Sequence, residues 1–130
     1  MLKKLKGLWH ELYGEQFDEQ LEELVELLEE RKEELNYLPD DSEWYKKGIV
    51  YSMYVDLFAG DFSGLIDRLD YLDELGVTAI WLLPILDSPM VDQGFDVSDY
   101  YKIREELGSN EEFFEFIEEA HQRGIKIIFD

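Results

Sequence analysis

From Gly48 onward, short runs of β-branched and aromatic residues alternate with segments whose apolar residues recur at helical spacing. The short runs cover residues 49–55, 79–83 and 125–129 and predict three β-strands. The run that ends at Pro84 is continuously apolar, which is typical of a parallel strand buried on both faces. Each intervening segment has the length of a right-handed crossover, so we expect the three strands to be parallel.

Two helices are predicted between these strands. The apolar positions of the first helix are Phe62, Leu65, Ile66, Leu69 and Leu72. Those of the second helix are Phe113, Phe114, Ile117 and Ala120. A glycine follows each helix, Gly76 or Gly124, and acts as a stop signal because glycine adopts the left-handed conformation that ends helices. Either Ser109 or Asn110 is the expected N-cap of the second helix.

The N-terminal part is acidic and strongly periodic between residues 15 and 35. One face of the predicted helix carries the apolar residues Phe17, Leu21, Leu24, Val25 and Leu28, and glutamates cover the other face. Residues 36–42 break this pattern with Pro39 and two aspartates and predict a polar linker. We therefore divide the chain into an N-terminal helical extension, residues 1–42, and the start of an α/β domain, residues 43–130.

The composition restricts the classes of partner. The 130 residues include 32 acidic and 12 basic side chains, and the net charge of -20 disfavours binding to nucleic acid or to an anionic membrane. No apolar run approaches the roughly 20 residues of a membrane span, and residues 1–9 lack the apolar core of a signal peptide. Without cysteine there are no disulfides. We expect a cytoplasmic protein, and a neutral ligand such as a sugar is compatible with its charge.

Three parallel strands with two crossover helices leave one face and one edge of the sheet uncovered. Two interpretations follow: a complete small α/β domain, or the first part of a larger sheet or barrel. The sequence stops at Asp130, at the carboxyl end of the third predicted strand, where the catalytic loops of such folds begin. We therefore expect a fragment that is marginally stable and that self-associates through its exposed sheet.

Ordered landmarks then identify a family. The segment from Gly76 to Pro84 resembles the second-strand motif of the α-amylase family of glycoside hydrolases and transglycosidases. Residues 88–100 resemble that family's next loop, in which Ser-Pro is followed by Asp, Gly-Tyr-Asp and Asp-Tyr. Leu107-Gly108 and the third strand through Asp130 match further landmarks. The resemblance implies that residues 43–130 are the first three β/α units of a TIM (β/α)8 barrel, preceded by the acidic helical segment.

The resemblance points to more than one branch of the family. The acidic extension and residues 54–61 are similar to amylosucrases and related sucrose-active members, whereas the Ser88-Pro89 loop is closer to trehalose synthases and α-glucosidases. The loop after the first strand lacks the Asp-x-Asn-x-Asp-Gly calcium pattern of some members, so no metal is expected there. No cofactor is expected either.

The family resemblance implies a retaining mechanism on α-glucosidic bonds of sucrose, maltose or an α-glucan. In such a mechanism one carboxylate attacks the anomeric carbon, and a second carboxylic acid protonates the leaving oxygen. In the family these groups lie on later strands, so no catalytic residue is expected in this chain. We expect the isolated chain to be inactive.

What the resemblance leaves in this chain is one wall of a sugar subsite. By resemblance, Asp96 would accept hydrogen bonds from hydroxyls of the non-reducing glucose, and Phe95 would stack on the sugar ring. The family usually has Tyr in place of Phe95, so a phenolic hydrogen bond is lost here. Asp130 would support the site as the Asp that opens the family's Asp-x-Val-x-Asn-His motif.

Each of these roles has a purely structural alternative. Asp96 would then be a turn or cap residue, Phe95 a core aromatic, and Asp130 a structural carboxylate. Trp81 is expected to pack rather than to bind sugar. The remaining polar residues considered are interpreted as turn, cap, surface or packing residues: His10, Asp56, Asp61, Asp92, Asp99 and His121.

Two other functions remain open from the sequence. The chain would be a free-standing acidic interaction module if the periodic helix around residues 17–28 docks a partner. It would be a non-catalytic relic of the enzyme if the α/β part only binds sugar weakly.

Overall fold

The computed structural model describes residues 2–35 and 43–130, so the linker expected at residues 36–42 lies outside the described residues. The chain separates into two compact units, Met1–Ser42 and Glu43–Asp130. We describe each unit by itself. The assignment of the first as an extension and of the second as an incomplete barrel stays a prediction.

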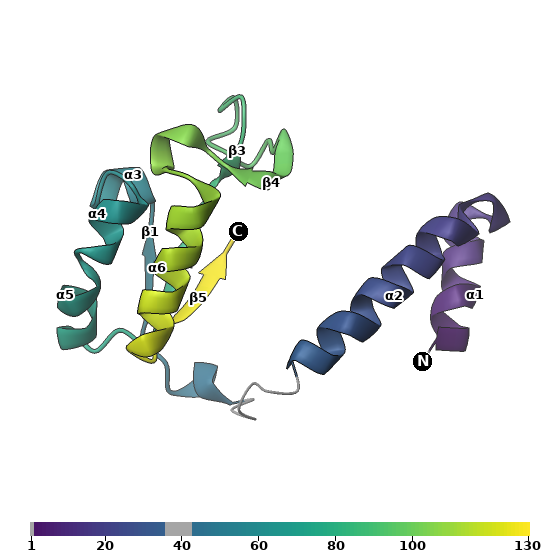
Figure 1. The fold of residues 1–130 in the computed structure, drawn as a ribbon, viewed down its shortest axis with the longest axis horizontal. Helices are drawn as coiled ribbons and strands as arrows, with labels where there is room; N and C mark the ends of the chain where they lie inside the picture. The colour runs from purple at the N-terminus through teal and green to yellow at the C-terminus, as the bar shows by residue number, and fades with distance from the viewer. Residues whose placement is uncertain (1, 36–42) are drawn as a thin grey trace. The chain divides into compact units, whose positions relative to one another are not determined.

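The first unit is helical (Figure 1). It contains α1 (Leu2–Tyr13), the 3-10 turn η1 (Glu15–Phe17) and α2 (Asp18–Leu35). Gly14, with φ of 82°, separates α1 from η1 in a conformation that favours glycine. Helix α1 was not predicted, because the short segment is rich in lysine and offers no clear start signal.

Helix α2 agrees with the predicted periodic segment, but its apolar face is poorly covered. Of that face only Leu21 is buried, while Phe17 and Leu28 are exposed. The turn between α1 and α2 is held by Trp9, whose indole N–H donates to the Phe17 carbonyl at 3.1 Å, and by the His10–Asp18 contact. His10 thus joins α1 to the start of α2 through a polar contact.

The second unit contains the three predicted parallel strands, β1 (Val50–Met53), β2 (Ala79–Leu82) and β5 (Lys126–Phe129), in the order β1-β2-β5 (Figure 1). Met53, Leu82 and Phe129 are in register across the sheet. Because side chains alternate along a strand, one face of β2 carries Ile80 and Leu82 and the other carries Trp81. All three strands therefore end at the same edge of the sheet.

Helices cover one face of this sheet. They are α3 (Val55–Phe58), α4 (Phe62–Ile66), α5 (Leu69–Glu74) and α6 (Asn110–Gln122). The rings of Phe62 and Phe116 lie 5.6 Å apart, and both side chains are fully buried with Leu65 and Ile80 in one core cluster. Burial of each such side chain contributes roughly 1.5–3 kcal/mol. The predicted apolar positions thus form the contact between helices and sheet.

Where one helix was expected over residues 62–72, the chain forms two short helices, α4 and α5. The separation falls at Asp67 and Arg68, and Gly64 weakens the preceding helix because glycine is a poor helix former. Leu65 and Leu69 are both fully buried on either side of the separation, so the apolar face continues through it.

The helix boundaries follow the predicted signals. Gly76 has φ of 83° and Gly124 has φ of 74°, as expected for stop positions. Ser109 is the N-cap of α6: its hydroxyl accepts the Glu112 N–H at 3.2 Å, and the Glu112 carboxylate accepts the Ser109 N–H at 2.7 Å. This reciprocal capping box settles the choice between Ser109 and Asn110.

The polar segment between the second predicted strand and the second predicted helix, residues 87–110, contains regular structure. A two-stranded antiparallel sheet joins β3 (Leu86–Asp87) to β4 (Asp99–Ile103), and a 3-10 turn η3 (Glu105–Leu107) leads to α6. Asn110 secures β4, accepting from the Ile103 N–H at 2.9 Å and donating to the Tyr101 carbonyl at 2.8 Å. Four of the five β4 residues are exposed, so the strand lacks the apolar alternation that predicts strands.

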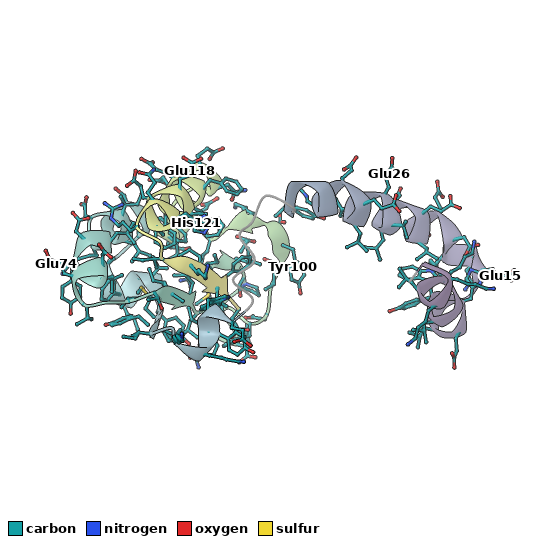
Figure 2. The ribbon with its side chains drawn as sticks, turned by 90° about the horizontal axis from the view of Figure 1, so that it is seen from below. Glu15, Glu26, Glu74, Tyr100, Glu118 and His121 are labelled. Atoms are coloured by element: carbon teal, nitrogen blue, oxygen red, sulfur yellow. The ribbon has the colours of Figure 1, made fainter. Side chains whose placement is uncertain are left out.

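The acidic side chains are largely at the surface. Glu26, Glu74 and Glu118 point away from their helices (Figure 2). His121 is also exposed on α6. No helix among the described residues is long and apolar enough to cross a membrane.

Candidate functional site

The loop of residues 88–96, called here the subsite loop, follows β3 and lies near the carboxyl ends of β1 and β2. Gly94 lies close to Pro84, two residues after β2, because a Cβ added at Gly94 would lie 2.8 Å from the Pro84 Cβ. The loop's contact with β1 is made by Tyr54, which directly follows that strand and whose hydroxyl lies 3.5 Å from Gln93 Oε1. The loop therefore sits at the sheet edge where (β/α)8 barrels place their active sites.

The backbone of this loop is tightly wound. Met90 and Gln93 have φ of 58° and 54°, and Gly94 has φ of 95°. Left-handed conformations at non-glycine residues are costly and persist where surrounding contacts hold them. The loop thus depends on specific hydrogen bonds for its shape.

Asp96 supplies most of those hydrogen bonds. Its Oδ1 accepts from Ser88 Oγ at 2.9 Å and from the Asp92 N–H at 3.1 Å, and its Oδ2 accepts from the Val91 N–H at 2.9 Å. The carboxylate therefore organises its own loop, as the turn-residue alternative expected. Two carboxylate oxygens have about four acceptor positions, so capacity remains for a ligand hydroxyl.

The surroundings of Asp96 favour its charged form. Partial burial acts to raise the pKa of Asp96, but hydrogen bonds from Ser88 and from the backbone of Asp92, Val91 and Asp96 itself outweigh it. The net result is a pKa held below the ordinary value of an aspartate. Asp96 is therefore an acceptor at neutral pH and is unsuited to be a proton donor.

Phe95 stands beside Asp96 with half of its surface free. Its side chain is 51% exposed, so it is not a core residue of the second unit. Its backbone N–H donates to the Asp92 carbonyl at 3.0 Å, which fixes the residue within the turn. An exposed ring held on a fixed backbone can stack on the C–H face of a flat apolar surface.

Asp130 lies at the carboxyl end of β5, on the same sheet edge as the subsite loop. Its backbone N–H donates to the Leu82 carbonyl at 3.2 Å, which continues the pairing of β5 with β2. Trp81 lies on the sheet face away from the helices, in register with Ser52 and Ile128. Asp99 has the expected turn role, accepting the Tyr101 N–H at 2.8 Å, and Asp61 caps α4 through the Gly64 N–H at 2.7 Å.

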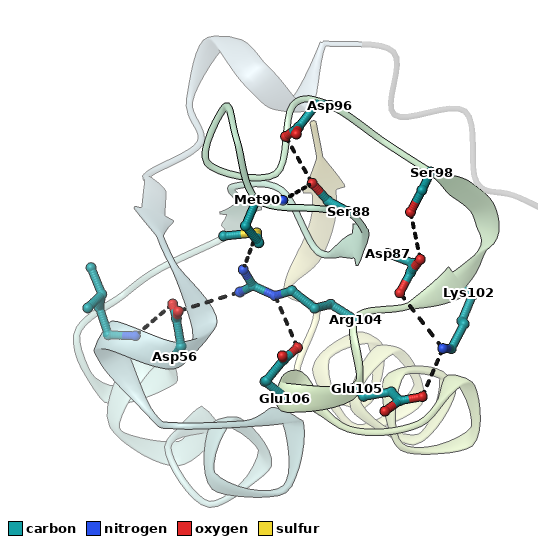
Figure 3. A network of polar contacts seen from close by, with 11 residues as sticks. Asp56, Asp87, Ser88, Met90, Asp96, Ser98, Lys102, Arg104, Glu105 and Glu106 are labelled. Atoms are coloured by element: carbon teal, nitrogen blue, oxygen red, sulfur yellow. Dashed lines mark hydrogen bonds and ion pairs between the residues drawn. The ribbon is translucent and has the colours of Figure 1, made fainter.

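The structure adds residues that the sequence did not single out. Arg104, directly after β4, is 7% exposed and reaches toward the subsite loop (Figure 3). Its Nη1 lies 2.8 Å from the Met90 sulfur, and its Nη2 lies 3.4 Å from Asp56 Oδ2. A single arginine in a polar stretch carries no sequence signal, and only the fold brings these three residues together.

A second polar group ties β3 to β4 on the same side of the unit (Figure 3). Asp87 Oδ2 accepts from Ser98 Oγ at 2.6 Å, and Lys102 Nζ lies 3.7 Å from Asp87 Oδ1. Lys102 also donates to Glu105 Oε1 at 2.9 Å, and this hydrogen bond raises the pKa of Lys102 above its usual value. These contacts hold β3, which precedes the subsite loop, to the chain that follows the loop.

Comparison with known proteins gives one matching family model, the alpha amylase catalytic domain, over residues 12–130. Among curated proteins, the chain is 45% identical over 96 residues to an oligo-1,6-glucosidase of Bacillus sp. strain F5, covering 68% of this chain and 19% of that protein. It is also 45% identical over 100 residues to the trehalose synthase/amylase TreS of Mycobacterium tuberculosis, covering 72% of this chain and 17% of that protein.

Solved structures agree with this result. The trehalose-6-phosphate hydrolase of Bacillus licheniformis is 48% identical with a TM-score of 0.63, over 67% of this chain and 17% of that one. The isomaltulose synthase SmuA of Protaminobacter rubrum is 39% identical with a TM-score of 0.63, over 68% and 17%. The chain thus spans less than a fifth of the length of these relatives.

Proposed function

Because this chain belongs to the α-amylase family, we propose that it supplies the first three β/α units, and one wall of the sugar subsite, of an enzyme acting on α-glucosidic bonds. The reaction is hydrolysis or transfer by a retaining mechanism. The substrate is a small α-glucoside or α-glucan, a neutral ligand compatible with a chain of net charge -20.

The observation that carries this proposal is the position of Phe95 and Asp96. Both belong to a loop that is anchored on the carboxyl ends of β1 and β2 through Tyr54 and Pro84. That edge is where (β/α)8 enzymes bind substrate. The relatives support the choice of ligand, since they include an oligo-1,6-glucosidase and a protein solved in complex with the substrate sucrose.

In the proposed site, Asp96 accepts a hydrogen bond from a sugar hydroxyl with the acceptor position that its loop leaves unused. Phe95 stacks on the ring, and Asp130 supports the neighbouring part of the site. The nucleophile and the acid of the retaining mechanism come from later strands of the family's barrel, as the resemblance implies. The described residues therefore bind and orient sugar and carry no bond-breaking step.

Sugar binding by the 130-residue chain tests this proposal. Maltose, sucrose and glucose are titrated separately while the amide signals of the subsite loop are followed by NMR. We expect shifts confined to this loop and affinities of millimolar or weaker, because one wall of a site provides few contacts.

Two exposed apolar residues of the same loop give a matched comparison. Phe95→Ala should weaken binding by about three- to tenfold through loss of ring stacking, whereas Val91→Ala should leave it unchanged. Equal affinities for the two variants, or shifts outside the loop, would contradict the assignment of Phe95. Micromolar affinity that is lost on Asp96→Ala would contradict the view that this chain holds only part of the site.

A further inference from the structure

Arg104 is buried, but few of its side-chain hydrogen-bond donors have good acceptors. The residue is 7% exposed, yet among the described residues its side-chain hydrogen bonds go only to the Met90 sulfur at 2.8 Å and to Asp56 at 3.4 Å. Its Nε lies 4.0 Å from Glu106 Oε2 and is the one buried side-chain nitrogen or oxygen atom among the described residues without a hydrogen-bond partner. Thioether sulfur is a weak acceptor, so most of the guanidinium's donor capacity is unused.

Such an arrangement does not favour stability. Burying a guanidinium carries a desolvation cost that pairing offsets only where the geometry is good and the remaining donors are satisfied. An apolar side chain of similar size at this position would avoid that cost. Buried charged groups can instead select one conformation of the chain among several. The contacts of Arg104 indicate that the conformation selected here is that of the subsite loop.

A chain of contacts joins Arg104 to Asp96. Met90, which touches Arg104 through its sulfur, is one of the two left-handed non-glycine residues of the described chain. The Met90 N–H donates to Ser88 Oγ at 2.9 Å, and that hydroxyl donates to Asp96 Oδ1 at 2.9 Å. Figure 3 shows this continuous path from Asp56 through Arg104 and Met90 to Ser88 and Asp96.

We propose that Arg104 is a positioning residue that sets the shape of the subsite loop by joining Met90 to Asp56 of α3. The guanidinium holds the Met90 side chain in place. The Met90 backbone is thereby fixed so that its N–H donates to Ser88 Oγ. The Ser88 hydroxyl and the Val91 and Asp92 amides then donate hydrogen bonds to the Asp96 carboxylate. The relevance of this shape to sugar rests on the proposed function, whereas the link between Arg104 and the loop does not.

Two substitutions in the full 130-residue chain test the link. Arg104→Met removes the charge and the contact, and Met90→Leu removes the sulfur acceptor while Arg104 keeps its charge. Both are read out by the NMR titration of the Asp96 carboxyl group and by hydrogen exchange at the Val91 and Asp92 amides. Arg123→Gln, at the exposed end of α6 where Arg123 pairs with Asp70 and Glu119, is the matched control.

Both test variants should raise the pKa of Asp96 toward its ordinary value and speed exchange at the two amides by about tenfold. Met90→Leu is decisive because a rise there cannot come from a lost positive charge. An unchanged Asp96 pKa and unchanged exchange in folded Met90→Leu would overturn the proposal. If both variants behave as expected but no sugar shifts the loop, the positioning role stands and the proposed function fails.

Discussion

The Asp96 side chain has two roles, one in its own loop and one in the proposed sugar site. Its carboxylate accepts from Ser88, Val91 and Asp92, and it is also the residue proposed to accept from sugar. These roles are compatible because a charged carboxylate has more acceptor positions than the loop uses. The same hydrogen bonds also make the loop sensitive to the protonation of one group.

We expect acid to loosen the subsite loop before it unfolds the second unit. The pKa of Asp96 is lowered in the folded chain, so its contribution to loop order is fully present above the ordinary pKa of an aspartate, about 3.9. That contribution is lost as the pH falls through the lower, folded value. Hydrogen exchange at the Val91 and Asp92 amides, measured as a function of pH, should show this loss.

Asp96→Asn is the informative variant for this pH dependence. Its amide oxygen can replace Oδ1, but the group does not titrate and offers Val91 no second acceptor oxygen. Exchange at Val91 should therefore be fast at all pH values. Asp67→Asn, between α4 and α5, should retain the wild-type profile. A wild-type profile in Asp96→Asn would show that another group controls the loop.

Helix α6 illustrates how an element is defined by its ends and by one face. The capping box of Ser109 and Glu112 begins it, and Gly124 follows its end. Its inner face packs Phe113 and Phe116 against Phe62 of α4, with ring centroids 5.2 and 5.6 Å apart. This helix therefore couples the last strand of the sheet to the helices that follow the first strand.

Two phenylalanines of α6 should differ sharply in their contribution to stability. Phe116→Ala should lower the free energy of unfolding by about 3–5 kcal/mol, because its side chain is fully buried and leaves a cavity. Phe114→Ala should change it by less than about 1 kcal/mol, because that ring is 60% exposed. Chemical denaturation monitored by circular dichroism measures both. Similar losses for the two variants would show that the described core is wrong.

In the second unit, the helices of the described residues lie on one face of the sheet. On the opposite face Val50, Trp81 and Ile128 are 37–47% exposed. Apolar sheet faces of this kind promote association, whereas a net charge of -20 opposes it through repulsion between copies. The balance between these effects should depend on salt.

We expect the 130-residue chain to self-associate, and more strongly as ionic strength rises, because salt screens repulsion and leaves apolar contacts intact. Sedimentation velocity at low and high salt measures the change. Ile128→Lys, on the exposed sheet face, should reduce association. Leu57→Lys, an exposed leucine of α3, adds the same charge elsewhere and should have less effect. A wild-type chain that remains monomeric at high salt would contradict the prediction.

Much of the second unit could be predicted from the sequence because its signals are local. Continuous apolar runs predicted the strands, and glycines with the Ser109 signal predicted the helix ends. Strand β4 was missed because its residues are mostly exposed, and helix α1 was missed because it lacks a clear start signal. The separation between α4 and α5 was also missed, since the buried leucines keep helical spacing through it.

The residue pattern by itself determined that the strands are parallel, the family, and the loop that contains Phe95 and Asp96. These depend on periodicity and on ordered landmarks, which are properties of neighbouring positions. Only the tertiary structure decided that Asp96 organises its own loop and that Arg104 reaches Met90 and Asp56. Arg104 and Asp56 are 48 residues apart in the chain, so their contact exists only once the strands and helices have packed together.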